Sequence, residues 1–166
     1  MTTVNPWRLP RTQLELHAEH LALGLLRTRP QLIDRCRCEL YGRLKASRHE
    51  IGLALLERAQ SALASRLRSS ALRSMDKRLR PLTELLQLND CEVALLRVCL
   101  MALENSLLMD VVSELQSKGR HAMTGALCKV LAFNRVQLAG ALRNGALVRA
   151  GLISAFELRV CSESLL

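Results

Sequence analysis

The chain has 166 residues, of which 49% are hydrophobic and only 2% aromatic, with four prolines and eight glycines. This length allows one or two small domains with a hydrophobic core and excludes a large multidomain enzyme. Leucine supplies 37 residues, and a leucine-rich, proline-poor composition is typical of a mainly α-helical fold.

The formal net charge of +9 is concentrated in the first half of the chain. Up to Thr83 there are 16 lysines and arginines against 7 acidic residues, whereas the second half has 8 of each. Nucleic-acid binding depends on cations that neutralise phosphates. The charge balance therefore predicts that a nucleic-acid partner, or another acidic partner, binds to the basic N-terminal half.

Three helices are predicted in the first 80 residues. A capping-box pattern, Thr12 to Glu15, precedes apolar residues at helical spacing and predicts a helix over 12–28. Pro30 suits the first turn of a second helix. The apolar row of that helix is Leu32, Ile33, Cys36, Leu40 and Leu44. A second capping-box pattern over 47–50 predicts a restart or kink before a long third helix, which continues through about residue 74 or beyond.

The Arg80-Pro81 pair marks a predicted boundary, since the residue before a proline is disfavoured in a helix. We expect a basic helical hairpin over 1–80 and a second helical domain over 81–166. The segment 93–112 is apolar, but four charged or polar residues interrupt it: Arg97, Glu104, Asn105 and Asp110. This segment is therefore predicted to form a pair of buried helices, divided at Asn105-Ser106, and no membrane span.

The C-terminal part continues with two short helices and one strand candidate. Asn89 to Glu92 has the N-cap and N3 acid of a helix start, and Gly119 suits the residue after a helix end. Helices are predicted over 121–132 and 135–144, with a turn at Phe133-Asn134. The alternating residues 153–160 are the single strand candidate.

Residues 126–142, with the sequence ALCKVLAFNRVQLAGAL, have the rhythm of a helix-turn-helix. The following stretch LVRAGLI, residues 147–153, resembles the exit of a winged-helix domain into its wing. More narrowly, residues 88–160 resemble the winged-helix region ahead of the ATPase module in a class of bacterial AAA+ ATPases. The resemblance implies a winged-helix-like domain that forms the N-terminal part of an AAA+ ATPase-like system.

No run of the form Gly-x-x-x-x-Gly-Lys-Ser/Thr occurs in the sequence, so nucleotide hydrolysis cannot be assigned to this chain. No spacing assembles a nucleophile, a base and oxyanion donors. We therefore expect no enzyme, no cofactor and no metal site, but a non-catalytic protein-interaction or regulatory module. The alternative is a DNA-binding transcriptional regulator that uses the helix-turn-helix over 121–144.

The second helix of this motif carries the first candidate site. A helical wheel turns Leu138, Ala139, Ala141 and Leu142 inward and leaves Val136, Gln137, Gly140, Arg143 and Asn144 outside. Gln137, Arg143 and Asn144 are the candidate contacts to a partner, because such side chains also read base edges.

A basic stripe on the predicted third helix is the second candidate site. If that helix continues to residue 80, one line along it carries Arg66, Arg73, Lys77 and Arg80. The stripe suits an acidic partner or phosphates, and the alternative interpretation is a solvated helix face.

The apolar rows of the two long predicted helices leave an apolar edge that no third element covers. We therefore expect a homodimer at micromolar concentration, in which a second copy covers this edge.

Two further groups were considered as metal ligands. His17 and His20 are three residues apart on the first helix, but the spacing fixes no third ligand. Cys36 and Cys38 point about 200° apart on a helix and cannot share a zinc ion. The remaining cysteines are Cys91, Cys99, Cys128 and Cys161. Residues 1–13 lack the apolar core of a signal peptide, so we expect free, mostly buried thiols in the reducing cytoplasm.

Overall fold

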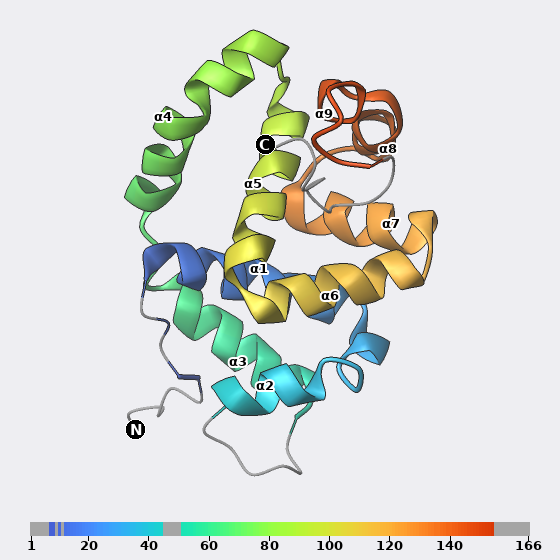
Figure 1. Cartoon of the computed structure of the whole chain (residues 1–166). Helices are drawn as coiled ribbons and strands as arrows, with labels where there is room; N and C mark the ends of the chain where they lie inside the picture. The colour runs from blue at the N-terminus through green and yellow to red at the C-terminus, as the bar shows by residue number, and fades with distance from the viewer. Residues whose placement is uncertain (1–6, 9, 11, 45–50, 155–166) are drawn as a thin grey trace.

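The computed structural model describes residues 7, 8, 10, 12–44 and 51–154, and within this range the chain is mainly α-helical, as predicted (Figure 1). Helix α1 (Gln13–Thr28) lies at the centre of the fold. It packs against α3 (Leu53–Ala64), α5 (Asp90–Glu104), α6 (Ser106–Ser117) and α7 (Arg120–Leu131). Its capping box is confirmed: Glu15 N donates to Thr12 Oγ1 at 3.1 Å, and Thr12 N donates to the Glu15 carboxylate at 3.0 Å.

The predicted second helix is divided into two pieces. Pro30 begins a 3-10 turn, η1 (Pro30–Leu32), and α2 (Arg37–Arg43) follows after an irregular turn. The prediction of a continuous second helix is therefore wrong, because Ile33 N and Arg35 N donate to carbonyls only three residues back, at 3.0 Å each. The apolar row is nevertheless buried as predicted, at Leu32, Ile33, Cys36, Leu40 and Leu44.

The predicted long third helix is also wrong, because the chain breaks between α3 and α4 (Ser69–Leu86). Arg68 is extended at the break, with φ −118° and ψ 122°. Side chains of α1 bind its backbone in place of helical hydrogen bonds: Arg68 N donates to Gln13 Oε1 at 3.1 Å, and His17 Nε2 lies 3.0 Å from Arg68 O. The capping-box pattern over 47–50 lies outside the described residues.

Helix α4 does not end at Arg80 as predicted, but passes through Pro81 to Leu86. A proline inside a helix costs about 3 kcal/mol. The apolar side chains of Leu79, Leu82 and Leu86 on this helix are partly buried against the core, and this partial burial offsets some of that cost. In Figure 1, α4 lies at the edge of the molecule and joins α5 through a sharp turn.

The C-terminal elements follow the predicted boundaries closely. Asn89 and Glu92 form a capping box at the start of α5, and Asn105 caps α6 by accepting from Leu108 N at 3.0 Å. Gly119, at φ 91°, separates α6 from α7. The apolar segment 93–112 is thus divided between two helices as predicted. Within the described part of the chain, no helix has the length and apolar content of a membrane span.

After α7 come α8 (Arg135–Asn144) and a short helix that the sequence did not predict, α9 (Ala146–Arg149). Of the strand predicted over 153–160, only its first two residues are described, and Ile153 is buried. The remaining strand positions and Cys161 lie outside the described residues.

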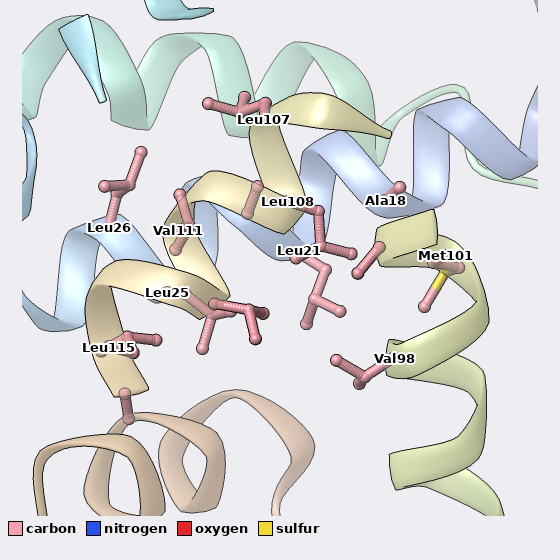
Figure 2. Packing of buried hydrophobic residues seen from close by; sticks show 14 of the residues in the cluster. Ala18, Leu21, Leu25, Leu26, Val98, Met101, Leu107, Leu108, Val111 and Leu115 are labelled. Atoms are coloured by element: carbon pink, nitrogen blue, oxygen red, sulfur yellow. The ribbon is translucent and has the colours of Figure 1, made fainter. Parts of the chain in front are cut away.

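One hydrophobic cluster takes side chains from both sides of the boundary predicted at residue 80. Figure 2 shows Leu21 and Leu25 of α1 facing Val98 of α5 and Val111 and Leu115 of α6. All five are buried. The two predicted segments therefore do not have separate cores.

A polar network ties the segment before α1 to α2 and α6. Glu19 is buried on α1 and accepts hydrogen bonds from Trp7 Nε1 and, at 2.7 Å, from Arg43 Nε. Arg43 also donates to Glu39 Oε2 at 2.6 Å. Ser106 Oγ donates to the same Glu39 oxygen, again at 2.6 Å. These groups satisfy a buried carboxylate and arginine, which would otherwise be costly to bury.

Described cysteines are free thiols, and their placement follows the sequence prediction. Cys36, Cys91 and Cys99 are buried, and Cys128 is half-buried, whereas Cys38 is exposed. At most one of Cys36 and Cys38 faces the core, as expected. Burial raises the pKa of both Cys36 and Cys99 to about 12.

Candidate partner-binding groove

Helices α7 and α8 pack against each other and are joined by a three-residue turn over 132–134. Ala132 adopts the left-handed conformation, with φ 57° and ψ 32°, and ends α7. Asn134 then caps α8, because its Oδ1 accepts from Gln137 N at 2.8 Å. In return Gln137 Oε1 accepts from Asn134 N at 3.4 Å. Both helices begin and end within one residue of the predicted positions.

The two faces of α8 differ as the helical wheel predicts. Leu138, Ala141 and Leu142 are buried against the rest of the domain. Ala139 is half-buried and lies at the edge of this face. The outward residues are Val136, Gln137, Gly140, Arg143 and Asn144. Val136 is 83% exposed, an unusual position for a β-branched apolar side chain.

The outer face of α8 and the first half of α7 line an open surface groove of about 690 Å³. Its lining residues are Arg120, His121 and Thr124 from α7, and Arg135, Val136, Ala139, Gly140, Arg143 and Asn144 from α8. Three of the nine are arginines and none is acidic. In the described part of the chain, no carboxylate lies within 4.0 Å of the guanidinium of Arg135 or Arg143.

The far end of α8 is fixed by a buried carboxylate. Glu92, at the start of α5, accepts hydrogen bonds from Asn89 N at 3.2 Å and from Ala146 N, the first residue of α9. Between α8 and α9 lies Gly145, where a Cβ would overlap both Ala141 O and Glu92 Oε1. Glycine at this position therefore lets α8 end against α5, and this contact holds the groove in place.

Two of the three contact residues predicted on α8 line the groove, and the third does not. Arg143 and Asn144 line the groove. Gln137 is exposed, but its side-chain oxygen is engaged in the cap of α8. The sequence prediction missed Arg120, which lies on α7, and Arg135, which begins α8 but was assigned to neither face of the helical wheel. A wheel of α7 would have placed Arg120 and Thr124, four residues apart, on one face.

The basic stripe does not exist in its predicted form. Arg66 lies in the break between α3 and α4, so it cannot share a helical line with Arg73, Lys77 and Arg80. These three are exposed on α4. Arg80 is paired with Glu84 on the same helix, Nε to Oε1 at 2.7 Å.

The two histidines considered as metal ligands have other surroundings. His17 contacts the backbone of Arg68. Burial, together with the neighbouring His17, lowers the pKa of His20. Among the described residues, no three His, Cys, Asp or Glu side chains are grouped closely enough to hold a metal ion.

Comparison of the chain with protein-family models, with curated proteins and with solved structures finds no match.

Proposed function

We propose that the chain acts as a non-catalytic interaction or regulatory module and that it binds its partner in the groove between α7 and α8. One observation carries this proposal: two helices direct Arg120, Arg135 and Arg143 to a hollow in which Val136 is almost fully exposed. A cationic rim around exposed apolar surface is typical of a binding face. The resemblance to the region ahead of an AAA+ ATPase module supports the same class of function.

Three of the cysteines are not suited to act as nucleophiles. A cysteine nucleophile reacts as the thiolate. With pKa values of about 12, Cys36 and Cys99 stay protonated at neutral pH. Burial also raises the pKa of Cys91, and the charges of Glu92 and Cys128 add to this rise. These three groups are therefore part of the core.

A DNA-binding regulator is the second candidate function. Arg143 and Asn144 are exposed next to each other on the last turn of α8 and line the groove. Arginine pairs with guanine and asparagine with adenine in the major groove. This candidate predicts sequence-selective binding of duplex DNA that is lost in Arg143→Ala and Asn144→Ala.

Site-specific photo-crosslinking in the native cells tests the proposal. A benzoylphenylalanine at position 136, in the groove, should give an adduct with a protein. The matched control is position 85 on α4, because Leu85 is 79% exposed and Val136 is 83% exposed. Absence of an adduct at 136, or identical adducts at both positions, would contradict the proposed binding face. A nuclease-sensitive adduct at 136 would favour the DNA-binding regulator instead.

A further inference from the structure

We infer that the partner enters the α7–α8 groove as an acidic amphipathic helix of another protein. This inference rests on the proposed function and gives the chemistry of the partner. It follows from three features of the groove: the charge of its rim, the size of the residues on its floor, and the chemistry of the exposed N-terminal half of α8.

The rim carries three arginines, of which Arg135 and Arg143 have no carboxylate within 4.0 Å among the described residues. Arg120 comes from α7, while Arg135 and Arg143 come from opposite ends of α8. Gly119, the N-cap of α7, offers no side chain to the first N–H groups of that helix, so the positive end of the helix dipole adds to the field at the groove. Aspartate and glutamate side chains match this rim, because arginine binds carboxylates through paired hydrogen bonds.

The floor of the groove suits a helix better than it suits a small ion. Ala139 and Gly140 are small, and a Cβ added at Gly140 would meet nothing within 4 Å. The backbone of a partner can therefore come close to α8. Val136 offers exposed apolar surface beside them. A helix that docks in a groove inserts apolar side chains at positions i, i+3 or i+4, and here the arginines would contact its acidic flanks.

The first two turns of α8 argue against duplex DNA as the occupant. A recognition helix places its N-terminal residues against base edges. Exposed or half-exposed positions in the first two turns of α8 include Val136, Ala139 and Gly140. These residues have no side-chain group that donates or accepts a hydrogen bond. The oxygen of Gln137 is already bound to Asn134 N. Hydrogen-bonding side chains in these turns are limited to Arg135 and the amide NH2 of Gln137, and the other candidate base readers, Arg143 and Asn144, lie in the last turn.

Fluorescence anisotropy with three designed peptides tests this inference. The 16-residue, end-capped peptides have leucine at the same helical spacing, and glutamate, glutamine or lysine at all other positions. A 20-base-pair duplex DNA is the fourth probe. We expect the glutamate peptide to bind the wild-type chain at least about tenfold more tightly than the glutamine peptide, and the lysine peptide not to bind.

Variants separate the groove from the general basic charge of the chain. Arg135→Ala combined with Arg143→Ala should weaken binding of the glutamate peptide by about tenfold or more. Arg58→Ala, at an exposed position on α3, should leave the affinity for the glutamate peptide within about twofold of the wild-type value. Gly140→Leu should abolish binding by filling the groove. Gly42→Leu is its control, because a Cβ on Gly42 in α2 also meets nothing within 4 Å.

Two results would overturn the inference. One is equal binding of the glutamate and glutamine peptides, and the other is equal loss in the groove variants and their controls. Tighter binding of the DNA than of the glutamate peptide, lost in Arg143→Ala, would also overturn it. If a protein adduct still forms at position 136, the proposed function stands and only the acidic helix is wrong; without that adduct, both fail.

Discussion

The ion-paired arginines of the N-terminal part and the arginines at the two ends of α8 in the groove have different surroundings. In the first part, arginines with carboxylate partners are Arg27, Arg37, Arg43 and Arg80. At the groove, Arg135 and Arg143 have no such partner among the described residues. Other cations of the N-terminal part, such as Arg73 and Lys77 on α4, are exposed and have no carboxylate within 4.0 Å among the described residues. A charge count by halves therefore does not separate the cations that serve the fold from those on the surface.

Arg43 illustrates the structural use of a cation. Its guanidinium contacts Glu19, Glu39 and Ser106, and so links α1, α2 and α6. Removing it leaves the buried carboxylate of Glu19 without its cation. In contrast, Arg143 is exposed on the surface, so we expect the stability of the fold not to depend on it. The next variants test this difference.

Arg43→Ala should have the largest effect on stability. Removal of one partner of a buried ion pair costs about 3–5 kcal/mol, because Glu19 has only 5% of its surface exposed. Arg143→Ala should change the free energy of unfolding by less than about 0.5 kcal/mol. Urea unfolding followed by circular dichroism measures both. A similar loss in the two variants would remove the contrast between structural and groove arginines.

Leu127→Ala should have the next largest effect and tests whether the two predicted segments unfold together. Leu127 lies on α7 with none of its surface exposed, so its truncation costs about 2–5 kcal/mol. Trp7 is the single tryptophan and reports on the other end of the chain. The shared core requires that Trp7 fluorescence and circular dichroism shift to the same lower urea midpoint.

An unchanged Trp7 transition in Leu127→Ala would contradict a shared core and would support separate domains on either side of residue 80. The control is Leu85→Ala, since Leu85 is 79% exposed on α4 and should leave both transitions within about 0.5 kcal/mol.

The sequence predicted the features of this fold that depend on neighbouring residues. The capping pairs Thr12–Glu15 and Asn89–Glu92 act within one turn, so their pattern is visible in the chain itself. The cap at Asn134 likewise placed the start of α8 correctly. The alternation of buried and exposed residues on α8 is local in the same sense.

Contacts between distant residues explain what the sequence did not predict. The break at Arg68 depends on Gln13 and His17, more than fifty residues away. The passage of α4 through Pro81 depends on packing against the core, which overrides the local preference. Arg120 reaches the groove only because α7 lies beside α8. The candidate site therefore required the tertiary arrangement, although Arg143 and Asn144 were found from the wheel.

Gly145→Ala should have an intermediate effect and tests how the groove is held. A Cβ there overlaps Ala141 O and Glu92 Oε1, so the last turn of α8 and the Glu92 side chain must both shift, at about 1–3 kcal/mol. Gly140→Ala is the matched control within α8, where the added Cβ is unhindered and should stabilise the helix by up to about 1 kcal/mol. Equal stability of the two variants in urea unfolding would show that Glu92 does not fix this end of α8.

Ser106→Ala should have the smallest effect, and the size of that effect depends on pH. Hydrogen bonds from Ser106 and then Arg43 lower the pKa of Glu39. A carboxyl group with a lowered pKa stabilises the folded state above its unfolded pKa, and this contribution is lost as the pH falls through its folded pKa. At neutral pH the variant should therefore be less stable than the wild type by about 1 kcal/mol, and the difference should disappear in acid.

Asp110, near the same network, has a pKa that burial and the charge of Glu39 raise, so its contribution has the opposite sign. The contribution of Asp110 is present in both the wild type and Ser106→Ala, so it largely cancels when their stabilities are compared. The control is Ser113→Ala on the same helix, because it is the same substitution at a serine that is not among the hydrogen-bond partners of Glu39. Urea midpoints at neutral pH and at about pH 3 decide the matter. A hydrogen bond to a carboxylate must weaken when that carboxylate binds a proton. If the stability difference between wild type and Ser106→Ala is the same at both pH values, the Ser106 hydroxyl therefore acts on packing alone.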